Sequence, residues 1–166
     1  MSTHKPKATD AVIVGAGPVG SYAALQLAKN GEAVTVYEEH PQIGVPQHCA
    51  GHISLKSLRK LGLYPLPDGV EENTFCAANF YSPQGTKFSL QLSSPVTVAL
   101  NRAKFDQFLA KQAQNAGAEF VLASRVDSLL ISAGSVSGVN VKQPTAKQCK
   151  LTPESFWTRR GFLRDF

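Results

Sequence analysis

A glycine-rich turn between two short segments is the feature that most constrains how this chain can fold. The β-branched run at residues 11–14 predicts a strand, and the apolar pattern at residues 21–29 predicts a helix. Between them, Gly15, Gly17 and Gly20 have the spacing of the turn in a dinucleotide-binding β-α-β unit. The turn therefore predicts an α/β fold of the Rossmann-like kind, with a parallel sheet.

Each residue of this turn has a predicted task. Gly15 allows the tight turn, Gly17 lets the backbone approach a pyrophosphate, and Gly20 lets the helix pack closely on the strand. Ala16 and Pro18 complete the turn. The free N–H groups and the positive dipole end at the start of the helix favour bound phosphates. The turn is therefore the predicted nucleotide-binding site.

A second predicted strand, at residues 33–37, ends at Glu38. The carboxylate of Glu38 can accept hydrogen bonds from a ribose diol. Because this negative charge would repel a 2′-phosphate, the site disfavours NADP. Glycine-rich turns also occur without a ligand, so a purely structural strand-turn-helix is the alternative.

Composition places the chain among globular proteins. Of its 166 residues, 43% are hydrophobic and 17% are charged, which suffices for a buried core. No apolar run approaches the roughly 18 residues that span a bilayer. Residues 1–9 are polar, which predicts a disordered tail and not a signal peptide. Cys49, Cys76 and Cys149 form no CxxC pair, which argues against a zinc site and favours a reducing, cytoplasmic location.

The net charge of +5 is mild, and the basic residues are spread along the chain without a long block. Because no nucleic-acid-binding motif accompanies them, we expect a solvated surface and no nucleic-acid partner. Peripheral contact with an anionic membrane surface is left open.

The rest of the chain alternates predicted strands and helices. Ser54 can cap a short helix that reaches residue 61 and follows a loop rich in Pro, Gly and His. Asn101 caps a long helix, and Gly117 ends it. Strands 75–81 and 86–92 are predicted to form an inserted hairpin around loop 82–85, and a further strand is predicted at 96–100. The helix at 102–115 has one side made of Phe105, Phe108, Leu109, Gln112 and Ala113. A parallel strand at 120–122 and an antiparallel pair at 125–131 and 135–141 follow.

The segment from residue 143 to 166 loses strand periodicity, which predicts an irregular tail. A Rossmann-like sheet needs further strands beside its first one, and no apolar run of that kind follows. We therefore expect residues 10–142 to form a nucleotide-binding domain that is incomplete at its C-terminus. A native C-terminal tail is the alternative.

Three segments give the chain a resemblance to a known family. They are Gly15-Ala-Gly-Pro-Val-Gly20 with Glu38, Pro46-Gln-His-Cys-Ala-Gly-His-Ile-Ser54, and Val98-Ala-Leu-Asn-Arg-Ala-Lys-Phe-Asp106. With these residues the chain resembles the N-terminal part of the FAD-dependent geranylgeranyl reductases, flavoproteins built like p-hydroxybenzoate hydroxylase. The Cys-Ala-Gly segment is the more specific of the three for the reductases. We expect the family to be roughly twice as long as this chain.

The resemblance implies an FAD-binding domain at residues 10–142. Gly15, Gly17 and Gly20 would hold the FAD pyrophosphate, and Glu38 would hold the adenosine ribose. In such enzymes reduced flavin hydrogenates isoprenoid double bonds of lipid precursors. The implied cofactor is therefore FAD, and the implied partner of the intact enzyme is an isoprenoid lipid.

The resemblance also implies contacts beyond the glycine turn. Cys49, Ala50 and Gly51 would lie near the flavin and the ribityl chain. Arg102 would reach FAD from the start of its helix, and Val126 would meet the adenine through its backbone. The later Asp-Gly flavin motif of the family is absent from this sequence. We therefore expect a partial FAD site and no activity from this chain alone.

Several alternatives stay open for single residues. Cys49 either contacts the flavin, as the one candidate catalytic residue, or is a small loop residue without chemistry. His40, His48 and His52 lack the spacing of a zinc ligand set, so polar loop residues are favoured and no metal is predicted. Arg102 either meets an anion or forms a surface ion pair.

Two other functions compete with the reductase. One is an FAD-dependent protein of the aromatic monooxygenase type, which would consume oxygen and NADPH. The other is a truncated nucleotide-binding module without catalysis. The Cys49-Ala-Gly51 segment favours the reductase over the monooxygenase.

Overall fold

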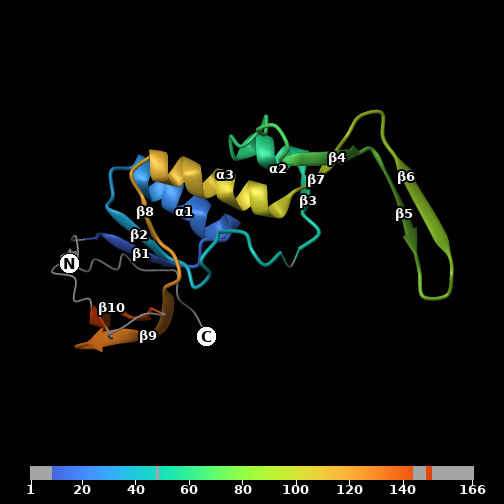
Figure 1. The fold of residues 1–166 in the computed structure, drawn as a ribbon. Helices are drawn as coiled ribbons and strands as arrows, with labels where there is room; N and C mark the ends of the chain where they lie inside the picture. The colour runs from blue at the N-terminus through green and yellow to red at the C-terminus, as the bar shows by residue number, and fades with distance from the viewer. Residues whose placement is uncertain (1–8, 48, 144–148, 151–166) are drawn as a thin grey trace. The chain divides into compact units, whose positions relative to one another are not determined.

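A computed structural model describes residues 9–47, 49–143 and 149–150 (Figure 1). The chain forms two compact units, of which the first comprises Met1–Val45 with Leu109–Phe166 and the second comprises Pro46–Phe108. His48 and nearly all of the two predicted tails lie outside the described residues.

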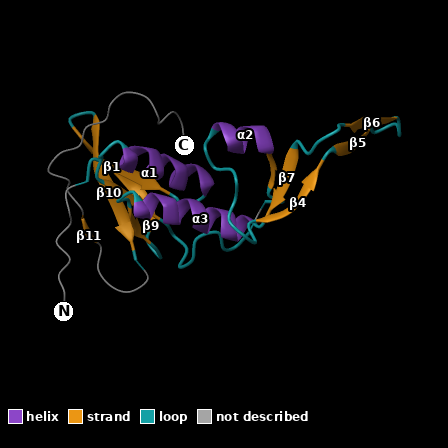
Figure 2. Cartoon of the chain, turned by 90° about the horizontal axis from the view of Figure 1, so that it is seen from above, coloured by secondary structure: helices purple, strands orange, loops and turns teal. Residues whose placement is uncertain are grey.

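The first unit is built around a parallel sheet. The sheet has the strand order β1-β2-β8, with β1 at Ala11–Val14, β2 at Val34–Tyr37 and β8 at Glu119–Val121. Helix α1 (Pro18–Lys29) and helix α3 (Arg102–Asn115) run side by side (Figure 2). The part of α3 from residue 109 onward belongs to this unit. The predicted Rossmann-like β-α-β arrangement is confirmed.

An antiparallel sheet packs on the face of the parallel sheet opposite the helices. It has the order β11-β10-β9, with β9 at Arg125–Ser132, β10 at Ser135–Lys142 and β11 at Cys149–Lys150. Tyr37 packs there against Val139 and Val141, whereas Val34 and Val36 pack on the helix side. Because side chains alternate across a strand, one short strand contributes to both layers. The predicted β9–β10 pair is confirmed, and β11 lies in the segment predicted to be irregular.

The second unit contains a small antiparallel sheet of order β3-β7-β4. Its elements are β3 (His52–Ser54), α2 (Leu55–Lys60), β4 (Glu71–Phe75), the hairpin of β5 (Ala77–Tyr81) and β6 (Lys87–Gln91), and β7 (Thr97–Leu100). Ser54 caps α2, as predicted, by accepting a hydrogen bond from the Ser57 N–H at 3.4 Å. Within this unit, the hairpin extends away from the sheet with its turn at the far end (Figure 1).

The β5–β6 hairpin has one apolar face and one polar face. Phe80 pairs with Phe88 and Ala78 pairs with Leu90, which places these four side chains on the same face. Phe80 is 54% exposed and Phe88 is 62% exposed. The Asn79–Ser89 pair on the opposite face forms a hydrogen bond of 2.7 Å, between Ser89 Oγ and Asn79 Oδ1. We call the first set of four residues the hairpin face.

Some predicted details are wrong for identifiable reasons. Helix α1 begins at Pro18 and not at residue 21, because proline is tolerated in the first helical turn, where no N–H is needed. The strand predicted at 75–81 is interrupted at Cys76, because β4 pairs with β7 whereas β5 pairs with β6. Gln112 is exposed, and Ala110 lies in the core. β3 was missed because three residues give no periodicity.

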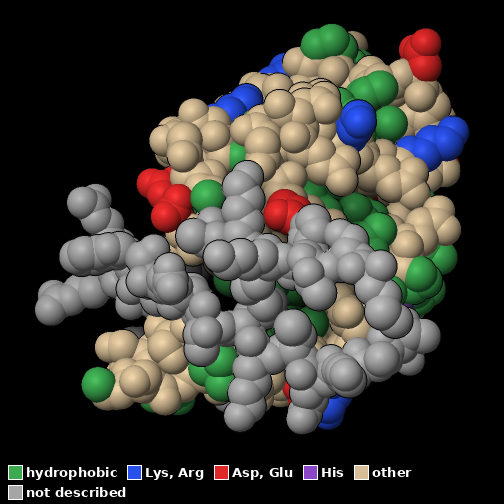
Figure 3. Space-filling model, turned by 60° about the vertical axis from the view of Figure 1, so that its left-hand side comes forward, with side chains coloured by type: hydrophobic (Ala, Val, Ile, Leu, Met, Phe, Trp, Pro, Cys, Tyr) green, Lys and Arg blue, Asp and Glu red, His purple; other side chains and the backbone are tan. Residues whose placement is uncertain are grey.

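Charged side chains are scattered over the surface that Figure 3 shows. On this face, Lys and Arg side chains lie singly or in pairs among other residues. This pattern agrees with the spread of basic residues along the sequence. Among the residues described, no helix has the length and apolar character needed to cross a membrane.

Candidate functional site

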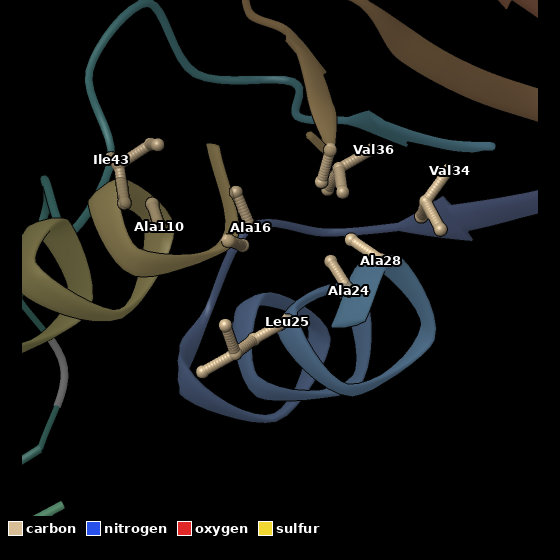
Figure 4. Packing of buried hydrophobic residues seen from close by; sticks show 10 residues of the cluster. Ala16, Ala24, Leu25, Ala28, Val34, Val36, Ile43 and Ala110 are labelled. Atoms are coloured by element: carbon tan, nitrogen blue, oxygen red, sulfur yellow. The ribbon is translucent and has the colours of Figure 1, made fainter. Parts of the chain in front are cut away.

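The core of the first unit anchors the glycine turn. Ala16 is 1% exposed and packs in the cluster between the helices and the sheet (Figure 4). The Gly15 N–H donates to the Tyr37 carbonyl at 2.8 Å, which ties the turn to β2. Gly15 adopts a φ of +94°, a conformation that L-residues with side chains rarely adopt. The buried members of the cluster are Ala16, Ala24, Leu25, Ala28, Val34, Val36, Ile43, Ala110, Ala113 and Ala118.

Gly20 is required by the packing of the protein itself. A Cβ at this position would lie 2.1 Å from the Gly15 carbonyl oxygen and 3.3 Å from Ile13 Cγ2. Both neighbours are fixed in the turn and in β1. This geometry supports the predicted role of Gly20 in close helix–strand packing.

Gly17 is different, because no contact within the protein excludes a side chain at this position. A Cβ on Gly17 would meet nothing within 4 Å, and its φ of −66° suits any residue. Gly17 is also the N-cap of α1, and no side chain caps this end of the helix. An open approach to uncapped N–H groups fits a bound pyrophosphate.

Glu38 is fixed beside this turn. Its backbone N–H donates to the Val121 carbonyl at 3.0 Å, and its carbonyl accepts from the Ser124 N–H at 2.8 Å. The side chain is 11% exposed. Its Oε2 accepts from the Ala16 N–H at 2.7 Å, and its Oε1 accepts from the His40 N–H at 3.0 Å and lies 2.6 Å from His40 Nδ1.

These contacts determine the charge of Glu38. Burial by itself would raise the pKa of the carboxyl group, but hydrogen bonds from the Ala16 and His40 N–H groups and from the His40 ring outweigh it. The pKa of Glu38 is therefore lowered from its ordinary value of 4.5. An ionised carboxylate beside the turn can accept hydrogen bonds from hydroxyl groups and repels other anions.

The segment that enters β9 lies next to Glu38. The Ala123 N–H donates to the His40 carbonyl at 3.0 Å. Arg125 Nη1 forms an exposed ion pair of 3.6 Å with Glu39 Oε2. The side chain of Val126 packs in the cluster around Tyr37. The structure thus places the turn, Glu38 and Val126 within one unit.

The second unit holds the other residues that the resemblance singled out. Gly51 has a φ of +71°, and a Cβ there would lie 2.3 Å from the Leu100 carbonyl oxygen. The Gly51 N–H donates to Cys49 Sγ at 3.5 Å. Cys49 is exposed, and the hydrogen bond from Gly51, followed by the Arg102 side chain, lowers the pKa of its thiol from 9.0.

Arg102 forms an ion pair that is largely buried. Its Nη2 lies 3.1 Å from Asp106 Oδ1, and the two side chains are 16% and 9% exposed. Burial raises the pKa of Asp106 although the Arg102 charge opposes this change. Both alternatives for Arg102 missed this buried partner. The i, i+4 spacing within helix α3 would have indicated it.

His40 and His52 each have a partner within their own unit. His40 contacts Glu38, and His52 Nε2 lies 2.7 Å from Thr97 Oγ1. Across the ranges that the structure describes, no group of three or more His, Cys, Asp or Glu side chains could hold a metal ion. Sequence reasoning treated His40 as a plain loop residue and so missed its contact with Glu38.

Comparison with known proteins identifies the fold and the relatives. A model of the NAD(P)-binding Rossmann-like domain matches residues 13–53. Digeranylgeranylglycerophospholipid reductase 1 of Methanopyrus kandleri is 38% identical over 130 residues, which cover 78% of this chain and 34% of that protein. An uncharacterised protein from the nifH2 5′ region of Methanosarcina barkeri is 33% identical, with 78% of this chain and 73% of that protein covered.

A solved structure agrees with these relatives. The geranylgeranyl bacteriochlorophyll reductase-like protein of Thermoplasma acidophilum superimposes with a TM-score of 0.76 and 30% identity, over 82% of this chain and 35% of that one. This chain thus spans about a third of the length of the reductases it matches. Because 130 matched residues make up 34% of the Methanopyrus kandleri protein, that protein is a little over twice as long as this chain, in agreement with the expected ratio.

Proposed function

We propose that this chain is the N-terminal part of a flavoprotein of the geranylgeranyl reductase family, and that it binds FAD for an oxidoreductase that reduces isoprenoid lipids. The observation that carries the nucleotide-binding part is the open approach at Gly17 beside an ionised Glu38. FAD, when bound, supplies the hydride-transfer chemistry. The isoprenoid substrate follows from the family and not from a pocket in the described residues.

Residues of the chain divide the binding task. The N–H groups at the start of α1 would hold the pyrophosphate, and Glu38 would hold the adenosine ribose. The β9 entry at Val126 lies in the same unit, which supports its assignment to the adenine. The assignment of Cys49, Ala50, Gly51 and Arg102 to the flavin rests on the family resemblance and stays a prediction.

The first test is binding of the nucleotide half of the cofactor. We expect the purified chain to bind ADP and FAD weakly in calorimetric titrations. Glu38→Arg should weaken ADP binding at least about tenfold, because it removes a charged hydrogen-bond acceptor. Glu32→Arg is the matched control, since Glu32 is exposed and its substitution makes the same change in charge. Equal ADP binding by the wild type and Glu38→Arg would remove Glu38 from the site.

Peripheral membrane contact is a second part of the proposal, and the hairpin face is its proposed surface. Phe80, Phe88 and Leu90 are 54%, 62% and 41% exposed, and Lys87, which precedes Phe88 near the turn, lies with Tyr81 on the opposite face of the hairpin. No Asp or Glu occurs from residue 73 to residue 105. Exposed aromatic residues with a basic neighbour and no nearby carboxylate suit an anionic lipid surface.

Sedimentation with lipid vesicles tests this surface. We expect the protein to sediment with phosphatidylglycerol vesicles and to stay in solution with phosphatidylcholine alone. Phe80→Ser/Phe88→Ser should abolish sedimentation, whereas Tyr81→Ser, on the opposite face, should retain it. Thermal unfolding of both variants checks that they fold. A lipid partner would be refuted if the double variant sedimented with the vesicles as the wild type does. It would also be refuted if the wild type formed a dimer that only the double variant failed to form.

A further inference from the structure

Glu38 uses its two carboxylate oxygens differently. Oε2 accepts one hydrogen bond, from the Ala16 N–H at 2.7 Å. Oε1 has two contacts with His40, to the backbone N–H at 3.0 Å and to ring Nδ1 at 2.6 Å. Because an ionised carboxylate can only accept, Nδ1 is the donor in the second contact.

These contacts determine how many further hydrogen bonds the Glu38 carboxylate can accept. A carboxylate offers about four lone-pair sites, two on each oxygen. His40 occupies both sites on Oε1, and Ala16 occupies one on Oε2. One site therefore remains, on Oε2. A ribose diol cannot engage both oxygens unless His40 gives way.

The surroundings of His40 favour this arrangement. Its carbonyl accepts from the Ala123 N–H at 3.0 Å, which holds the backbone in place. The neighbouring carboxylate of Glu39 is directed to Arg125, at 3.6 Å. The His40 side chain is 43% exposed and the Glu38 side chain is 11% exposed. The imidazole thus covers one side of a buried carboxylate.

We propose that His40 is a positioning residue for the bound nucleotide, which holds Oε1 of Glu38 so that Oε2 receives a single ribose hydroxyl. This inference rests on the proposed nucleotide site. In it, His40 acts through Glu38 and does not touch the ligand. Without the imidazole, the carboxylate would rotate and bind the ribose less well.

The test compares two nucleotides and two substitutions. We expect His40→Ala to weaken ADP binding roughly five- to tenfold, which is the effect of removing one charge-assisted hydrogen bond. The same variant should bind 2′,3′-dideoxy-ADP as the wild type does, because that ligand has no hydroxyl for Glu38. His40→Asn should restore most of the ADP affinity, since its amide places a donor near the position of Nδ1.

A second measurement needs no nucleotide. Titration of the Glu38 carboxyl carbon by NMR should show its pKa rising toward the ordinary value in His40→Ala and returning in His40→Asn. If His40→Ala lost the same affinity for ADP and for dideoxy-ADP, or bound ADP more tightly than the wild type, the role of His40 would be overturned and the nucleotide site would stand. Absence of ADP binding by the wild type would overturn the proposed nucleotide site together with it.

Discussion

Gly17→Val is expected to abolish measurable ADP binding while the protein stays folded. The isopropyl group would project into the open space before α1, where the Cβ meets no protein atom within 4 Å. It would occupy the approach that a pyrophosphate needs to reach the helix N-terminus. The fold should lose about 1 kcal/mol, because valine is a poorer N-cap than glycine.

Two measurements separate these effects. Calorimetry should show no ADP binding by Gly17→Val at concentrations where the wild type is saturated. Circular dichroism with thermal unfolding should show a native fold and a Tm lower by roughly 2–4 °C. Val19→Ala is the control for a neighbouring substitution, since Val19 is 82% exposed. ADP affinity equal to that of the wild type would exclude this turn as the phosphate site.

Gly20→Ala, by contrast, should mainly lower the free energy of unfolding. The new methyl group would lie 2.1 Å from the Gly15 carbonyl oxygen, far inside van der Waals contact. To remove this steric clash, α1 would have to move away from β1 or the turn would have to open. Overpacking of this kind costs about 1–3 kcal/mol and more when backbone is the obstacle. The expected loss, about 3 kcal/mol, is a large share of a typical total stability.

Urea unfolding provides the measurement. Gly20→Ala should unfold at a clearly lower urea midpoint than the wild type, and Val19→Ala should stay within about 0.5 kcal/mol of it. Any loss of ADP binding in Gly20→Ala should follow the loss of folded protein. A wild-type midpoint would show that the turn relaxes easily and that Gly20 does not hold α1 against β1.

The two glycines show how far a sequence pattern can be interpreted. Both belong to one motif, and the spacing assigned both to a dinucleotide turn. In the structure, contacts within the protein exclude a side chain at Gly20 but not at Gly17. The alternative of a purely structural turn therefore accounts for Gly20, whereas for Gly17 it offers only the preference for glycine at an N-cap.

Local elements were the most predictable part of the fold. β1 has the predicted bounds, and Gly117, predicted to end the long helix, follows α3 with a φ of +108°. These features depend on neighbouring residues and on backbone conformation, which the sequence states directly. The break at Cys76 was not predictable, because it depends on the pairing of β4 with β7, which is distant in sequence, whereas β5 pairs with its hairpin neighbour β6.

The candidate site also has parts that the sequence predicted and parts that only the structure revealed. The sequence by itself determined the glycine turn, the acidic residue after β2 and the resemblance to the reductases, because these depend on residue type and spacing. Only the tertiary structure decided that Glu38 reaches back to the Ala16 N–H, 22 residues away, that His40 covers its other oxygen, and that the Arg102–Asp106 pair is largely buried. Such contacts arise when packing brings side chains together and removes them from water, and no local pattern encodes that.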